Sequence, residues 1–73
     1  MSRERDTVRE AWQERLKDLD VAEIQRLTSL PLSKITAFLD GVAGDLTFED
    51  VRALCEATQS NLASFRAVTG KWF

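Results

Sequence analysis

Glycine and proline are scarce in this chain of 73 residues, and they stand where helices begin or end. Pro31 suits the first position of a helix, where its missing N–H costs nothing. Gly41 and Gly70 suit the left-handed residue that ends a helix, and Gly44 lies in the loop "GVAGDL". Between these positions apolar residues recur at helical spacing, and no stretch alternates apolar and polar residues as a strand does. The sequence therefore predicts an all-α chain of short helices.

The first two helices are predicted from capping residues followed by apolar faces. Thr7 and Glu10 have the spacing of a capping box, and Asp20 begins the second helix with a carboxylate three residues later at Glu23. The apolar positions expected in the core are Val8, Trp12, Leu16 and Leu19 of the first helix, with Ile24 and Leu27 of the second. Charged residues of mixed sign cover the rest of the first helix, which indicates a solvated surface.

Three further helices are predicted after Pro31. The third ends at Gly41, the fourth is capped by Thr47 with Asp50 at its third position, and the fifth begins at Ser60 or Asn61. Their expected core positions are Ile35, Phe38, Leu39, Val51, Leu54, Cys55, Thr58, Leu62, Phe65 and Val68. Five short helices predict a compact all-α bundle that forms a single domain over residues 1–73.

The side-chain inventory offers little for catalysis. The chain has no histidine, no tyrosine and one cysteine, Cys55, which excludes a Cys/His metal cluster, a disulfide framework and a histidine-based triad. Its acidic residues are spread along helix faces and alternate with Arg and Lys. We therefore expect no enzyme activity, no metal and no cofactor, and we expect Cys55 to be a small core residue.

The expected location is the cytoplasm. No apolar run approaches the ~18 residues of a membrane span, and the start "MSRERD" lacks the apolar core of a signal peptide. The absence of paired cysteines is typical of a reducing compartment.

The segment "KITAFLDGVAGDLTFEDVRALCEAT" resembles the lambda-repressor-like helix-turn-helix family, of the Cro and xenobiotic-response-element type. Members commonly show an aliphatic residue, an aromatic–Leu pair and Gly, then a Leu-Thr pair that opens a helix with a central Leu. These places hold Ile35, Phe38, Leu39, Gly41, Leu46, Thr47, Val51 and Leu54. The resemblance covers about residues 20–65. It implies a helix-turn-helix at the second and third helices and a DNA-binding transcriptional regulator of the repressor type, acting as a homodimer on double-stranded DNA.

In such a protein the third helix would lie in the major groove. The side chains expected to face the DNA are Leu32, Ser33, Thr36 and Ala37, with Lys34 near the edge and Arg26 on the preceding helix. Serine and threonine hydroxyls can bond either kind of base edge, and apolar side chains can pack on thymine methyls. None of these residues offers the bidentate contact of Arg with guanine or Gln with adenine, so discrimination between bases is expected to be weak.

Several positions depart from the family pattern by losing polar or basic residues. Members usually carry Gly, an aliphatic residue and Ser in the turn, a phosphate-binding Gln at the start of the second helix, and basic residues within and after the third. The corresponding residues here are Ser29, Leu30 and Pro31, then Val21, then Ala37, Val42 and Ala43. With a net charge of −2 and a pI near 5.0, the chain is also unusually acidic for a lone DNA-binding module.

These departures leave a second function open. The same fold can serve as a protein-interaction or oligomerisation module with little DNA affinity of its own. The tail, residues 70–73, ends in Trp72 and Phe73, two large aromatics that are seldom left in water. They are expected to dock on the first helix or to bury against a second copy, so they are candidate oligomer contacts. Of the two functions, the resemblance favours DNA binding.

Overall fold

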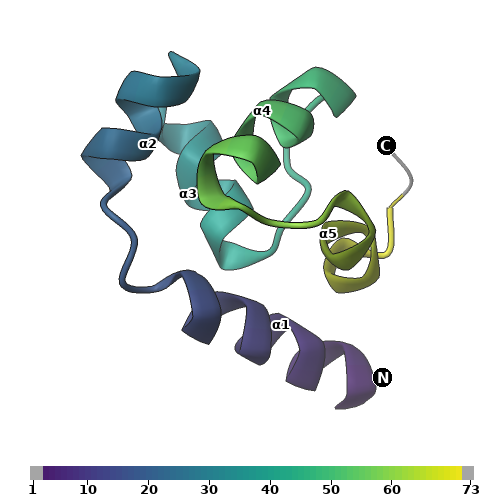
Figure 1. Cartoon of the computed structure of the whole chain (residues 1–73). Helices are drawn as coiled ribbons and strands as arrows, with labels where there is room; N and C mark the ends of the chain where they lie inside the picture. The colour runs from purple at the N-terminus through teal and green to yellow at the C-terminus, as the bar shows by residue number, and fades with distance from the viewer. Residues whose placement is uncertain (1–2, 72–73) are drawn as a thin grey trace.

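Five α-helices pack around one hydrophobic core in the computed structural model of the chain (Figure 1). The structure describes the backbone of residues 3–71 and the side chains of residues 7–71, so Trp72 and Phe73 lie outside it. The helices are α1 (Arg3–Leu16), α2 (Val21–Thr28), α3 (Leu32–Asp40), α4 (Phe48–Thr58) and α5 (Leu62–Thr69). Within 3–71 no residue belongs to a strand, and the predicted all-α class with five helices is confirmed. None of these helices has the length and apolar content needed to cross a membrane.

Three aromatic rings join the two ends of the sequence to its middle. Phe38 of α3 stacks on Phe65 of α5 with ring centroids 4.7 Å apart, and Trp12 of α1 lies 5.2 and 5.3 Å from these two rings. The Trp12 indole also donates a 2.8 Å hydrogen bond to the Phe38 carbonyl, one of the last carbonyls of α3. In Figure 1, α1 accordingly lies beneath α3 and α5. This cluster fixes the position and the roll of α3.

The predicted helix starts at Asp20, Thr47 and Asn61 are confirmed. Asp20 accepts a hydrogen bond from the Ala22 N–H, and Asn61 caps α5 in the same way. Thr47 and Asp50 form the predicted capping box, with both hydrogen bonds 3.1 Å long. These caps are local in sequence, and each satisfies backbone N–H groups that the first turn of a helix leaves unpaired.

Gly41 ends α3 in the left-handed conformation, with φ of 76°. A methyl group at this position would lie 2.7 Å from Cγ1 of Val68 and 3.2 Å from Cγ of Arg9. Glycine is therefore required twice, for its backbone angle and for the close approach of α5 and α1.

Two predictions about the first helix and the core are wrong. The first helix begins at Arg3 rather than at Thr7, so the helical backbone already includes the residues before the expected cap. Leu27, expected in the core, is 57% exposed and lines an open groove whose α4 side includes the small residues Ala53 and Ala57. Val8 and Leu19 are also exposed, whereas the remaining predicted core residues are buried or packed against the core.

Candidate functional site

The connection between α2 and α3 holds the two helices in a fixed corner. Ser29 adopts the left-handed conformation, with φ of 60°, and its N–H donates to the Gln25 carbonyl at 2.7 Å. The Gln25 side chain donates to the carbonyl of Leu30, and the Leu30 side chain packs against the core. Pro31 then caps α3 in an extended conformation. The corner is anchored from inside, so the outer side of α3 has a defined direction.

The outer side of α3 carries three of the predicted recognition residues. Leu32, Ser33 and Thr36 are exposed, while Ile35 and Phe38, which face the core, are completely buried. The Thr36 hydroxyl donates to the Leu32 carbonyl at 2.9 Å, so it presents acceptor lone pairs outward. Within residues 7–71 the Ser33 side chain forms no hydrogen bond, and it can both donate and accept. The outer face of α3 therefore offers two hydroxyls and one large apolar side chain.

Lys34, which was predicted near the edge of the DNA-facing side of α3, forms an ion pair with α4. Its Nζ lies 2.6 Å from Oδ2 of Asp50, the residue that completes the α4 capping box. The two side chains are 29% and 12% exposed, so the pair is partly shielded from water. The hydrogen bond from Lys34 lowers the pKa of Asp50, although burial opposes this. The charge of Lys34 is thus neutralised by a carboxylate of the same chain.

Ala37 does not stand out from α3 as Thr36 does. It is half-buried against the core, and its carbonyl accepts a 3.0 Å hydrogen bond from the Val42 N–H. The loop after α3 folds over it, and a methyl group at Gly44 would lie 3.6 Å from the Ala37 Cβ. Ala37 therefore forms the border between α3 and this loop, which adds the exposed side chain of Val42 to the surface.

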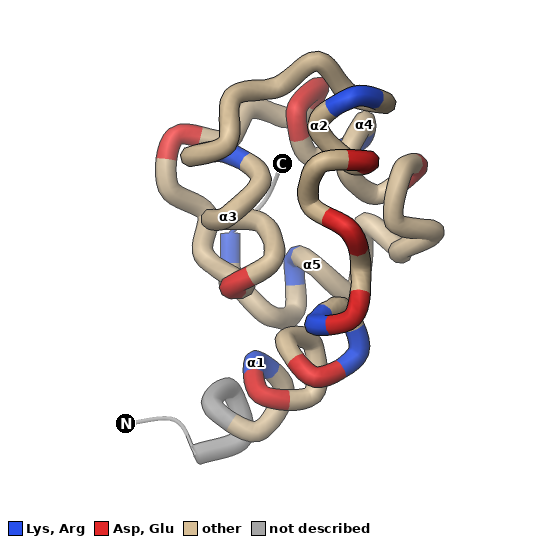
Figure 2. The backbone as a smooth tube through the Cα atoms, turned by 90° about the vertical axis from the view of Figure 1, so that its left-hand side faces the viewer, with Lys and Arg blue, Asp and Glu red and all other residues tan. Residues whose placement is uncertain are grey.

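Arg26 lies on the outer surface of α2 and forms an ion pair with Glu23 one turn earlier. Both side chains are well exposed, at 71% and 45%, so the pair is weak and Arg26 can leave it at little cost. Figure 2 shows basic and acidic positions interspersed along the described backbone. Arg26 and Lys34 each pair with a different acidic residue, Glu23 and Asp50 respectively.

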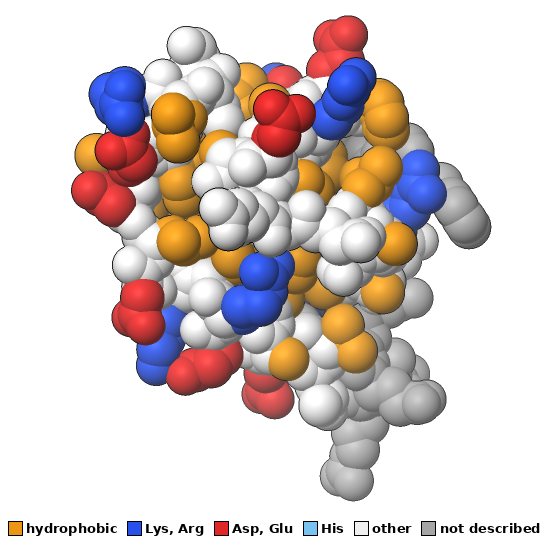
Figure 3. Space-filling model, viewed as in Figure 1, with side chains coloured by type: hydrophobic (Ala, Val, Ile, Leu, Met, Phe, Trp, Pro, Cys, Tyr) orange, Lys and Arg blue, Asp and Glu red, His pale blue; other side chains and the backbone are white. Residues whose placement is uncertain are grey.

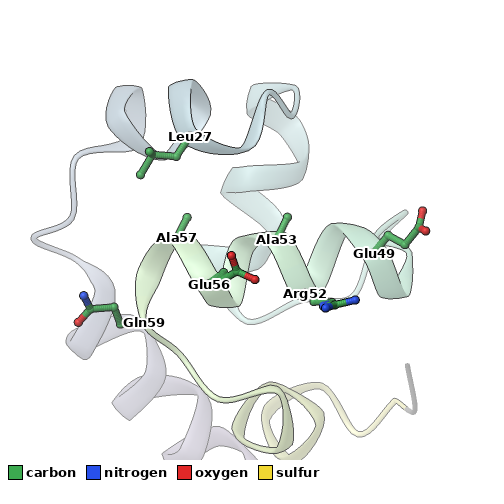
Figure 4. A pocket seen from close by; sticks show the side chains of 7 residues that line it. All are labelled: Leu27, Glu49, Arg52, Ala53, Glu56, Ala57 and Gln59. Carbon is green, nitrogen blue, oxygen red and sulfur yellow. The ribbon is translucent and has the colours of Figure 1, made fainter.

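A groove between α2 and α4 was missed by the sequence analysis. Its volume is about 640 Å³, and Ala53 and Ala57 point from α4 toward α2, which carries Leu27 (Figure 4). Its lining residues are Leu27, Glu49, Arg52, Ala53, Glu56, Ala57 and Gln59. On this side of the molecule apolar side chains show between charged ones (Figure 3). Two alanines four residues apart in the fourth helix were the only signal for it, because small residues leave the neighbouring helix uncovered.

The described residues show little reactive chemistry. Residues 7–71 contain no group of His, Cys, Asp or Glu side chains that could hold a metal ion. Cys55 is buried, and burial raises the pKa of its thiol, which keeps it in the unreactive protonated form. The exposed groups on α3 are suited to recognition through hydrogen bonds and apolar contact.

No protein-family model, curated protein or solved structure matches this chain. What it does has therefore to be inferred from the outer face of α3 and the residues around it.

Proposed function

We propose that this chain is a small DNA-binding transcriptional regulator, in which α2 and α3 act as a helix-turn-helix and α3 enters the major groove. The observation that carries the proposal is the α2–α3 corner. An eight-residue helix, a turn with left-handed Ser29 and a nine-residue helix present Leu32, Ser33 and Thr36 outward from a rigid core. The major groove, about 12 Å wide, admits a helix held in this way.

The side chains on the outer face of α3 define what it can read. The Ser33 hydroxyl can donate to or accept from a base edge, and Thr36 accepts while its hydrogen is bonded to the Leu32 carbonyl. Leu32 can pack on a thymine methyl. These contacts are single and partly apolar, so we expect half-sites that contain thymine and that tolerate several base changes.

The scarcity of free positive charge makes a second copy necessary. Each neutralised phosphate contributes a slope of roughly −0.9 to the dependence of log K on log salt. Lys34 is held by Asp50 and Arg26 pairs weakly with Glu23, so one copy neutralises few phosphates. Two copies on half-sites about 34–36 Å apart gain affinity from the high effective concentration of the second α3. Trp72 and Phe73 remain predicted contacts between such copies.

Selection from a random duplex library at low and physiological salt tests this function. We expect the wild type to enrich a motif with two half-sites, and the double variant Ser33→Ala, Thr36→Ala to lose it while keeping its melting temperature. Ser64→Ala, which removes an exposed hydroxyl on α5, is the matched control and should enrich the same motif. Failure of the wild type to enrich any motif, together with salt-independent binding, would contradict the proposal.

A protein contact through the same face is a second candidate, and one observation favours it. Leu32 and Val42 are 54% and 43% exposed, and they lie on α3 and in the loop directly after it. A partner protein or a second copy that covers them gains from burying apolar surface, and this gain is insensitive to moderate salt. Sedimentation of the Leu32→Lys variant tests it: dissociation of a wild-type dimer that binds no duplex would favour this function over DNA binding.

A further inference from the structure

Lys34 is the only basic residue of α3, so it is the only side chain of this helix that can form an ion pair with a DNA phosphate. We infer that Asp50 acts as an internal substitute for a DNA phosphate, holding Lys34 against α4 and so limiting the affinity of α3 for duplex. This inference rests on the proposed function and adds a restraint that is built into the fold.

The geometry of the pair is suited to such competition. The Nζ–Oδ2 distance of 2.6 Å is that of a strong charge-assisted hydrogen bond. Both side chains are partly exposed, so the pair lies at the surface, where a phosphate can approach Lys34. At the same time the shielding is enough for the pair to persist in water, unlike the exposed pair of Arg26 with Glu23.

Asp50 also has a second partner that stays when Lys34 leaves. Its Oδ2 accepts the Thr47 N–H at 3.1 Å, and the carboxylate lies in the first turn of α4, where the helix dipole favours a negative charge. Asp50 is therefore stable at its place without Lys34. Loss of its charge should free Lys34 and leave the capping geometry in place.

The test is a double-mutant cycle on Asp50 and Lys34, with binding to a random-sequence duplex measured at several salt concentrations. Asp50→Asn keeps an oxygen that can accept the Thr47 N–H but removes the charge. It should tighten binding about eightfold at 0.1 M salt and steepen the salt slope by about 0.9, the effect of one added phosphate contact. Lys34→Met should weaken the wild type by less than about twofold but the Asp50→Asn protein by about eightfold.

A matched control separates release of Lys34 from a simple change in net charge. Asp45→Asn makes the same charge change on the exposed loop between α3 and α4, and it should leave the salt slope unchanged. Equal tightening by Asp45→Asn and Asp50→Asn would overturn the inference, as would a full eightfold loss on Lys34→Met in the wild type. The effect of Lys34→Met in the wild type tests the inference even when Asp50→Asn is poorly folded. If the wild type binds duplex but the effects of the Asp50 and Lys34 substitutions simply add, this inference is overturned and the proposed function stands. If neither the wild type nor any variant binds duplex, the proposed function is overturned as well.

Discussion

The two sides of α3 differ in their surroundings: one packs against the core and the other contacts solvent. On the inner side, Ile35 and Phe38 are completely buried, and the Phe38 ring contacts Phe65 and Trp12. On the outer side, Leu32 and the neighbouring hydroxyl residues contact solvent. The inner side therefore fixes where the helix lies, while the outer side contributes little to folding. One short helix can thus be rigid and still present a surface whose residues are set by a ligand rather than by the core.

The largest expected effect comes from removing the inner side. Phe38→Ala loses two ring contacts and leaves a cavity, so it should destabilise the protein by about 3–5 kcal/mol. A domain of this size is stable by roughly 4–11 kcal/mol, so the loss should be a large part of the total stability. Urea unfolding followed by circular dichroism measures it. Leu32→Ala on the outer side is the control, expected within about 0.5 kcal/mol of the wild type; similar losses for both variants would contradict the difference between the sides.

The next effect lies at the end of α3. Gly41→Ala places a methyl group 2.7 Å from Val68 in a left-handed backbone, and it should cost about 2–4 kcal/mol. Gly44→Ala is the matched control, because that glycine is also left-handed but its added methyl group would make only an ordinary 3.6 Å contact. It should cost about 1–2 kcal/mol. Thermal melting of both variants tests whether the approach of α5, and not the backbone angle alone, sets the requirement at Gly41.

A smaller effect is expected at the edge between the two sides, where Lys34 meets Asp50. Because Lys34 lowers the pKa of Asp50 in the folded protein, this carboxyl stabilises the fold above the ordinary aspartate pKa of about 3.8. That contribution is lost as the pH falls through the folded pKa. In Lys34→Met the difference in stability from wild type should therefore be full at pH 7 and shrink below about pH 4. A difference that is constant from pH 7 to pH 3 would show that it does not come from the charge of Asp50.

The smallest effect is expected at the α2–α4 groove. Leu27→Ala removes a side chain that is 57% exposed and should change stability by no more than about 0.5–1 kcal/mol. Ile24→Ala, one turn earlier and buried, is its control and should cost about 2–4 kcal/mol. Equal effects on urea unfolding would mean that Leu27 is covered in solution, for instance by a second copy.

The features that the sequence predicted correctly are local ones. A capping box such as Thr47 with Asp50 needs only residues three apart, and the helical period alone places Ser33 opposite Ile35. The start of the first helix was missed because a second helix-compatible stretch precedes Thr7, and local rules do not choose between the two.

The features that could not be predicted depend on residues far apart in the chain. The exposure of Leu27 depends on which residues of another helix lie across from it, and here these include the small residues Ala53 and Ala57. The partner of Lys34 is 16 residues away, and a short charged side chain on α4 gives no sign in the sequence of which cation it meets. The sequence therefore predicted which residues lie on the outer face of α3. It could not predict that Lys34 is paired, because this depends on how α3 packs on α4.

Amide chemical shifts on titration with duplex would test the central claim most directly, that the outer face of α3 recognises DNA. With a selected or random 20-base-pair duplex at low salt, we expect the largest shifts at residues 32–37 and at the start of α4. Signals of the buried core around Phe65 should move little. Shifts confined to the α2–α4 groove or to α5, or no shifts at all, would contradict the claim.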